Sequence, residues 1–414
     1  MGFLNRLNRS LKDTLSFKIA LVVCCILLII IREPDLLVSP RLWAEEGFIF
    51  YSFALHHSIW DIFTTAHVGY LTLFNSIVSL IQAKAFSIEN AATVSTYMGF
   101  LVQLIPVYII TFTNNKFWDS ALKKVISAFI VIIVMAPELW VNTTNSHFIF
   151  GLITFLIMLV SATELSTFNK YFFRLLLLIG GLTGPASIFF TPTFLLKAYK
   201  EKSKEKIIQA GIITLCAFIQ ACVILYAIFF NNKYNRLTVH NLKITRYHFI
   251  IDNFSLLPHS AHLNYQLFSV DLTTLFGLLT GCLYIFLLVK YRGKDSYLIP
   301  LLSVIVVAIF STLGSLDMAG GARYAYVPTC VLLIIITSQI FELPFTKINY
   351  VVLPILLICL TTNAIWYRPL IHEWMYKPSA PKWKNEVAKW RADTTYLPKT
   401  HPDVSDSDGW PVKL

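Results

Sequence analysis

The chain has 414 residues, of which 56% are hydrophobic and 14% are charged, and its mean hydropathy is +0.64. This apolar share exceeds that of water-soluble domains, so the composition excludes an ordinary globular protein. The net charge of +11 does not indicate a nucleic-acid partner, because many basic residues flank apolar segments instead of forming one polar domain.

The apolar segments recur along the whole chain and are long enough to cross a hydrocarbon layer of about 30 Å. Because lipid offers no hydrogen-bond partner to an exposed backbone amide, such segments must be helices. The sequence therefore predicts an all-α, polytopic transmembrane helical bundle, with the lipid bilayer as its environment.

The first apolar segment, residues 17–31, follows the basic residues Arg6, Arg9 and Lys12. No small-residue cleavage site follows it, so we expect a retained helix with a cytoplasmic N-terminus. The seven cysteines lie inside apolar segments, where they act as small hydrophobic residues. Their spacing predicts neither a disulfide framework nor a metal site.

Later apolar segments bring the total to about eleven if each one crosses the membrane. They start near Gly69, Thr93, Val125, His147, Phe172, Ile207, Asp271, Leu298, Val327 and Tyr350. Strict alternation of these segments would place Lys116, Lys123, Lys124, Lys170 and Arg174 on the outer side. That placement opposes the usual bias of basic residues towards the cytoplasm.

We expect instead that residues 69–86 and 172–196 enter the membrane without crossing it. The second of these segments is interrupted by the run from Gly180 to Pro185, which contains three glycines. About nine full crossings then remain, and the C-terminus lies on the outer side.

Two parts of the chain follow from this topology. Residues 1–366 form the transmembrane unit, whose first outer loop is residues 32–66, and residues 367–414 form a short outer tail. In the tail, Trp383, Val387 and Trp390 recur at helical spacing. They predict a helix with two indoles on one face, lying on the membrane interface.

An acidic pair, Glu45 and Glu46, occupies the first outer loop. If residues 41–50 are helical, Arg41 and Glu45 are neighbours at i,i+4 and can pair, which leaves Glu46 as the less neutralised carboxylate. Glu46 is then the first candidate for a general base. The alternative is a solvated acidic pair at the level of the lipid headgroups.

Several outer residues could bind a polar substrate. His67 and Tyr70 follow the acidic loop and could bond sugar hydroxyls, although such residues also anchor helices at membrane interfaces. The stretch that contains Glu138, Asn142 and Asn145 and ends at His147 is dense in hydrogen-bonding groups. It can line a carbohydrate pocket or form a capped turn between helices.

Arg323 and Tyr324 follow a Gly-Gly pair at the outer mouth of a helix. An outward arginine departs from the positive-inside bias and is suited to bind a lipid-linked phosphate, unless Asp317 tethers it. Arg246 belongs to a basic outer connection that could steer an anionic substrate, or could simply contact headgroups.

These features together resemble the integral-membrane GT-C glycosyltransferases. The likeness comprises acidic residues in the first outer loop, many apolar helices and the motif Arg323-Tyr324-x-x-x-Pro328. The stretch from Trp43 to Gly47, the basic N-terminus and the small tail most resemble bacterial O-antigen glucosyltransferases of phage-type serotype-conversion clusters. The family more often has Asp in its acidic pair, whereas this chain has two Glu residues.

The resemblance implies hexosyl transfer, with glucose as the expected sugar, from a polyprenyl-phosphate donor to a cell-surface polysaccharide such as O-antigen. The reaction would occur on the periplasmic side of a bacterial inner membrane. Glu46 or Glu45 would be the base. The donor phosphate would be bound by Arg323, Tyr324 and Arg41, and the sugars by His67, Tyr70, Glu138, Asn142, Asn145, His147 and Arg246. The sequence predicts no protein metal site, but a divalent cation between the acidic pair and the donor phosphate stays open.

Other classes remain as alternatives. An O-antigen polymerase or ligase would use outer arginines on the same kind of lipid carrier. A lipid-linked oligosaccharide flippase should carry charges near the membrane midplane, and the apolar segments here are nearly free of them. A membrane acyltransferase is weaker still, because no early histidine stands out as its base.

Overall fold

The computed structural model of the chain describes residues 12–134, 136–231, 270–313, 322–341, 349–369, 381–401 and 410–414. These residues form helices joined by turns, and their β-type pairing is confined to isolated bridges. The predicted all-α class is thereby confirmed.

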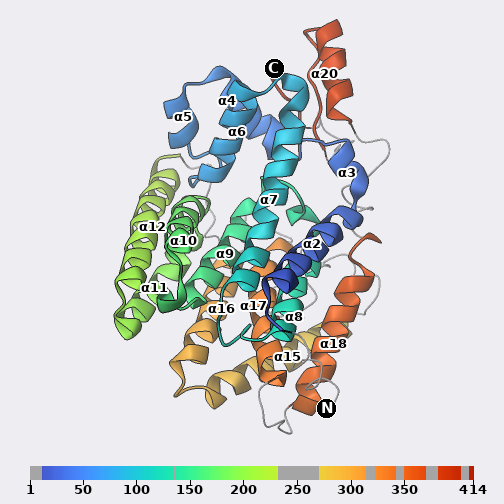
Figure 1. Cartoon of the computed structure of the whole chain (residues 1–414). Helices are drawn as coiled ribbons and strands as arrows, with labels where there is room; N and C mark the ends of the chain where they lie inside the picture. The colour runs from blue at the N-terminus through green and yellow to red at the C-terminus, as the bar shows by residue number, and fades with distance from the viewer. Residues whose placement is uncertain are drawn as a thin grey trace.

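Nine helices of the described chain begin close to the predicted starts of the apolar segments. They are α2 (Leu15–Arg32), α7 (Ala91–Phe112), α8 (Ala121–Ile133), α9 (Ser146–Leu159), α12 (Lys204–Asn231), α15 (Val270–Lys290), α16 (Asp295–Leu313), α17 (Ala322–Ile340) and α18 (Asn349–Ile365). Central α9 is buried along almost its whole length (Figure 1).

Four helices in the described ranges are long and apolar enough to cross a membrane: Leu15–Arg32, Ile88–Phe112, Lys204–Phe230 and Arg323–Ile340. Shorter apolar helices accompany them, among them Ser146–Leu159 and Val352–Ile365. The chain is therefore a helical membrane protein, because apolar helices of this length match the hydrocarbon thickness.

One end of the bundle gathers lysines, and we call it the basic end. Lys124 Nζ lies 2.7 Å from Asp13 Oδ2, which ties the start of α8 to the start of α2. Lys200 Nζ lies 2.9 Å from Asp295 Oδ2 and ties the end of α11 (Ala186–Glu201) to the start of α16. Lys116 of the α7–α8 turn donates to the Ser296 hydroxyl at 2.6 Å, so these lysines lie at the end of the bundle where α2 and α16 begin.

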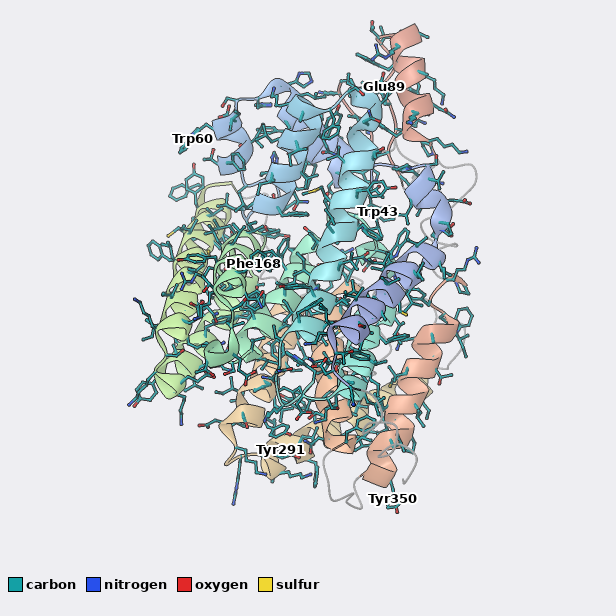
Figure 2. All side chains as sticks on the ribbon, in the orientation of Figure 1. Trp43, Trp60, Glu89, Phe168, Tyr291 and Tyr350 are labelled. Carbon is teal, nitrogen blue, oxygen red and sulfur yellow. The ribbon has the colours of Figure 1, made fainter. Side chains whose placement is uncertain are left out.

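The opposite end carries the long connections and the tail, and we call it the loop end. Arg32 Nε donates to the Tyr367 carbonyl oxygen at 2.8 Å, joining the ends of α2 and α18. Figure 2 shows Glu89 beside α20 (Trp383–Ala392), where the Arg391 guanidinium binds it at 2.6 Å.

Two segments stop part-way along the bundle and meet. At the loop end, α6 (Leu73–Ala85) begins beside the break between α10 (Thr167–Gly181) and α11. Thr72 and Thr183 form an antiparallel bridge there. The break falls within the predicted Gly-rich interruption, and all three helices are shorter than the candidate membrane spans.

A glutamine of α12 closes this junction. Gln220 Oε1 accepts from Leu71 N at 3.0 Å, and its Nε2 donates to the carbonyl oxygens of Leu71 and Gly184 at 3.0 and 3.1 Å. Non-helical backbone inside a membrane bundle needs such partners, because lipid supplies none. The junction therefore satisfies its backbone with protein groups.

Short helices build the loop end: α3 (Pro34–Val38), η1 (Glu46–Tyr51), α4 (Ser52–His56), α5 (Ile59–Thr64), η2 (Ile88–Asn90) and η3 (Pro137–Leu139). A further turn, η4 (Ala162–Glu164), links α9 to α10.

The predicted tail helix is present as α20, and Trp383 and Val387 of its apolar face pack on the protein. Trp383 and Val387 are buried against Leu42 and Tyr51 of the first outer loop. The Trp383 indole donates to the Ile88 carbonyl oxygen at 2.7 Å. A protein surface offers this face both apolar contact and a polar acceptor, so the face packs on the protein.

Candidate functional site

The carboxylate of Glu46 connects several segments of the loop end through hydrogen bonds. Its exposed fraction is 2%, and it accepts from Trp43 N at 2.8 Å through Oε2. Its Oε1 accepts from the backbone N and, at 2.8 Å, from the hydroxyl of Thr143. The Ser95 hydroxyl of α7 lies 3.1 Å from that of Thr143. Glu46 therefore joins the first outer loop to the connection between α8 and α9.

The backbone on both sides of this carboxylate is strained. Ala44 has φ of 40° and Val141 has φ of 48°, a left-handed conformation that is an outlier for a β-branched residue. Such positions cost about 1–3 kcal/mol each and persist only where the surroundings impose them. Gly99 permits the close approach, because a Cβ there would lie 2.7 Å from Asn142 N and 2.8 Å from the Val141 carbonyl carbon.

The tail fixes the same loop from the other side. Trp43 and His401 form a parallel bridge, in which His401 N donates to the Leu42 carbonyl oxygen at 3.0 Å. The Thr400 hydroxyl donates to the Ala44 carbonyl oxygen at 3.4 Å. The loop that carries the acidic pair is thus held between the α8–α9 connection and the tail.

The two acidic residues differ sharply in environment. Glu46 is buried, and burial raises the pKa of its carboxyl, against the lowering effect of its hydrogen bonds. Glu45 is half-exposed, and within the described ranges its side chain makes no hydrogen bond or ion pair. The expectation that residues 41–50 form one helix is wrong: residues 41–44 are not helical, because they pair with the tail. The i,i+4 argument that favoured Glu46 over Glu45 therefore fails.

Arg323 lies at the start of α17, beside Glu138. The guanidinium Nη1 is 3.8 Å from Glu138 Oε2 and its side chain is 26% exposed. Glu138 Oε1 accepts from Arg323 N at 3.0 Å, an arrangement that satisfies a helix N-terminal amide. Tyr324 packs edge-on against Phe148 at 5.1 Å between ring centroids. The suggested tether Asp317 lies outside the described residues.

The two asparagines of the α8–α9 connection hold its shape. The side-chain amides of Asn142 and Asn145 donate to the Glu138 carbonyl oxygen at 2.7 and 2.8 Å. Asn142 Oδ1 accepts from Asn145 N at 3.2 Å. Both side chains are buried and connect the Glu138 end of the turn to its Thr143 end, and Asn142 also lines a small cavity.

The histidines predicted to bind sugar lie in aromatic surroundings. The His67 ring meets Phe53 edge-on at 4.5 Å, and burial lowers its pKa to about 4, so it is neutral at physiological pH. Tyr70 and His147 lie together, with ring centroids 6.0 Å apart. They stand at the Thr72–Thr183 junction. α6 begins there, and its Asn75 side-chain amide donates to the carbonyl oxygen of Thr143, the partner of Glu46, at 2.9 Å.

Arg41 is buried and lines a small cavity of about 30 Å³ with Trp140 and His401. That volume holds a water molecule. Arg246, the remaining predicted residue, lies outside the described residues.

Sequence reasoning missed Thr143, Ser95, Gly99 and His401. The polar run around Thr143 gave a local signal, and a lone glycine inside an apolar helix marks a close approach. Nothing local pointed to His401, because its partner is far away in the chain.

Within the described part of the chain, no three His, Cys, Asp or Glu side chains come together as a metal site requires. When compared with family models, curated proteins and solved structures, the chain matches none.

Proposed function

We propose that the chain is a hexosyltransferase that moves glucose, or a related sugar, from a polyprenyl-phosphate donor to a cell-surface polysaccharide such as O-antigen. One observation carries the proposal. The loop end presents a carboxylate that has no partner among the described residues, Glu45, and a partly exposed guanidinium, Arg323. Both are mounted on one buried scaffold, in which Glu46 binds Thr143 and the asparagines bind the Glu138 carbonyl.

In this proposal the protein is a GT-C-like bundle of about nine crossings in a bacterial inner membrane, with two segments that enter without crossing. The basic end would face the cytoplasm, because lysines such as Lys116 and Lys124 gather there. The loop end, with the C-terminal tail, would then face the periplasm, where the acceptor polysaccharide is assembled.

Glu45 would be the general base, and Glu46 a positioning residue. A base must reach the proton that it removes, and the oxygens of Glu46 are taken by Trp43 and Thr143. The acceptor hydroxyl would give its proton to Glu45 as its oxygen bonds to the anomeric carbon. The bond from that carbon to the phosphate oxygen would break, releasing polyprenyl phosphate. One displacement of this kind inverts the anomeric configuration and needs no covalent sugar on Glu.

Arg323 would stabilise the departing phosphate. Its 3.8 Å separation from the Glu138 carboxylate is longer than a good charged hydrogen bond. A phosphate that forms two short bonds to the guanidinium can therefore replace this contact. Glu138 would keep its bond to the backbone amide of Arg323, so the helix start would stay in place.

The experiment is transfer of radiolabelled glucose from undecaprenyl-phosphoglucose to O-antigen, in membranes with matched amounts of wild type, Glu45→Gln or Glu46→Gln. Loss of a general base slows such reactions by about 10²–10⁴-fold, so Glu45→Gln should lose activity at normal protein levels. Loss confined to Glu46→Gln in a normally folded protein would assign the base to Glu46 instead. Full activity in both variants would remove the carboxylate mechanism and favour a polymerase or ligase.

A further inference from the structure

An apolar groove of about 600 Å³ runs between α11 and α12, on the outside of the bundle. Small residues form its floor: Ala198 and Ala210 are buried, and a Cβ added at Gly211 would meet nothing within 4 Å. The exposed side chains of Leu215 and Phe218 border it. The groove therefore has the shape and chemistry to hold a hydrocarbon chain.

Two lysines that have no ion pair among the described residues stand at the groove's end. α11 ends at Glu201, and Lys202 follows it in a left-handed conformation (φ 51°) that turns the chain directly into α12. Lys202 and Lys204 are exposed, and the described residues offer neither an ion pair. The neighbouring cations differ: Lys197 binds Glu201 at 3.3 Å and Lys200 binds Asp295. Two positive charges are thus left for an anion from outside the protein.

The distance between these two features suits a membrane lipid. The groove follows α12 from Ile207 to Phe218, which is about 16 Å at the helical rise of about 1.5 Å per residue. Half of a hydrocarbon layer of about 30 Å is nearly the same length. Lys202 and Lys204 precede this stretch by only a few residues. Their ammonium groups therefore lie near the level at which the phosphate of a lipid follows its acyl chains.

We propose that the α11–α12 groove binds an anionic glycerophospholipid of the surrounding leaflet, with an acyl chain in the groove and its phosphate at Lys202 and Lys204. The contact of Lys200 with Asp295 places this hinge at the basic end. Glu45 and Arg323 lie at the loop end, so the site is separate from the proposed transfer site and does not rest on it. The bound lipid holds α11 against α12 beside the break that meets Thr72.

The test measures thermal unfolding of the purified full chain in detergent, with added phosphatidylglycerol or phosphatidylethanolamine. Phosphatidylglycerol should raise the midpoint by several degrees more than phosphatidylethanolamine. Lys202→Gln with Lys204→Gln should remove this difference, whereas the control Lys382→Gln with Lys384→Gln, at exposed positions around the start of α20, should keep it. Gly211→Leu should fill the groove and abolish the gain, and Gly281→Leu, at an equally open helical glycine, should not.

Equal stabilisation by the two phospholipids, or a phosphatidylglycerol effect that survives both groove variants, would overturn the proposal. Undecaprenyl phosphate is the third ligand of the experiment. If it displaces phosphatidylglycerol and stabilises more strongly, the groove belongs to a polyprenyl lipid and the assignment to a phospholipid is wrong.

Discussion

Glu46 in the first outer loop and Glu386 in the tail helix are equally buried, each 2% exposed, but they are held by different kinds of partner. Among the described residues, Glu46 accepts from neutral donors of Trp43, Thr143 and Ser95. Glu386 accepts from the Lys389 ammonium at 2.6 Å and from the Tyr396 hydroxyl. One carboxylate joins distant segments without a cation, and the other belongs to a local charged cluster.

This difference sets their protonation in opposite directions. Burial raises the pKa of Glu46, and its hydrogen bonds do not outweigh that effect. Burial also acts upward on Glu386, but its bonds from Lys389, Tyr396 and the Lys399 amide together lower its pKa. A buried carboxylate therefore stabilises its ionised form only when its partners, above all a cation, offset the lost hydration.

The largest expected effect on stability comes from removing the Glu46 carboxylate, which joins its loop to the α8–α9 connection. Glu46→Ala leaves the amides of Trp43 and Thr143 and the Thr143 hydroxyl buried without an acceptor, at about 1–3 kcal/mol for each group. We expect the free energy of unfolding to fall by about 3 kcal/mol or more, measured by denaturant or thermal unfolding. Glu45→Ala, whose side chain has no protein partner in the described ranges, is the control and should change little. Equal effects of the two substitutions would refute the assigned roles.

A substitution that leaves Glu46 in place tests whether the junction depends on close packing. In Gly99→Ala the new Cβ would press on the backbone of Val141 and Asn142, which cannot rotate away. We expect a loss of about 1–3 kcal/mol, measured as above. Gly211→Ala, in open space on α12, should be neutral or slightly stabilising. A neutral Gly99→Ala would show that the connection is free to move.

The pH dependence separates the two carboxylates by sign. The ordinary carboxyl pKa here is 4.5. Because the pKa of Glu386 is lowered in the fold, its contribution is present above that value and is lost as the pH falls through the folded pKa. Glu386→Gln should therefore cost about 1 kcal/mol at neutral pH and almost nothing in acid.

Glu46 should behave in the opposite way. Its folded pKa is raised, so the stability that it contributes is largest in acid and declines as the pH rises from 4.5 through the folded pKa. As the pH rises, the free energy of unfolding of the wild type should accordingly fall relative to that of Glu46→Gln. Unfolding midpoints of both variants between about pH 2 and pH 8 check the two signs, and parallel curves would contradict them.

The smallest effect is expected at the outer contact of the tail helix. Arg391 binds Glu89 with side chains that are 59% and 33% exposed. Exposed ion pairs contribute about 0.2–1 kcal/mol, and salt screens them. Arg391→Gln should lower stability within that range, and less in high salt. Lys384→Gln, on the same helix, is the control, and an effect as large as that of Glu386→Gln would mean that the pair helps to dock the tail.

The sequence predicts the parts of this fold that depend on local pattern. The apolar segment that was predicted to begin near His147 is helix α9, which begins at Ser146. The glycines before Pro185 mark the break after α10. Helix formation in lipid follows from composition and length alone, so these predictions do not require knowledge of neighbouring helices.

The candidate site was harder to predict from the sequence, because contacts between distant residues override the local helical preference. A helix across residues 41–50 is a reasonable local expectation, but pairing with His401 and the left-handed Ala44 replace its first turn. The burial of Glu46 depends on Thr143, and the role of Gly99 depends on Val141. None of these relations leaves a periodic signal in the sequence.

The bridge between Trp43 and His401 also has a consequence for biosynthesis. Thr400 and Ala44, which flank this bridge, are 356 positions apart, so the acidic loop cannot meet its partner until the ribosome has translated that whole stretch. The early helices can enter the bilayer while translation continues, but the loop cannot take its final shape. Contacts of such high sequence separation form late and slowly. Any activity located there is therefore acquired only after the tail has been synthesised and has paired with the loop.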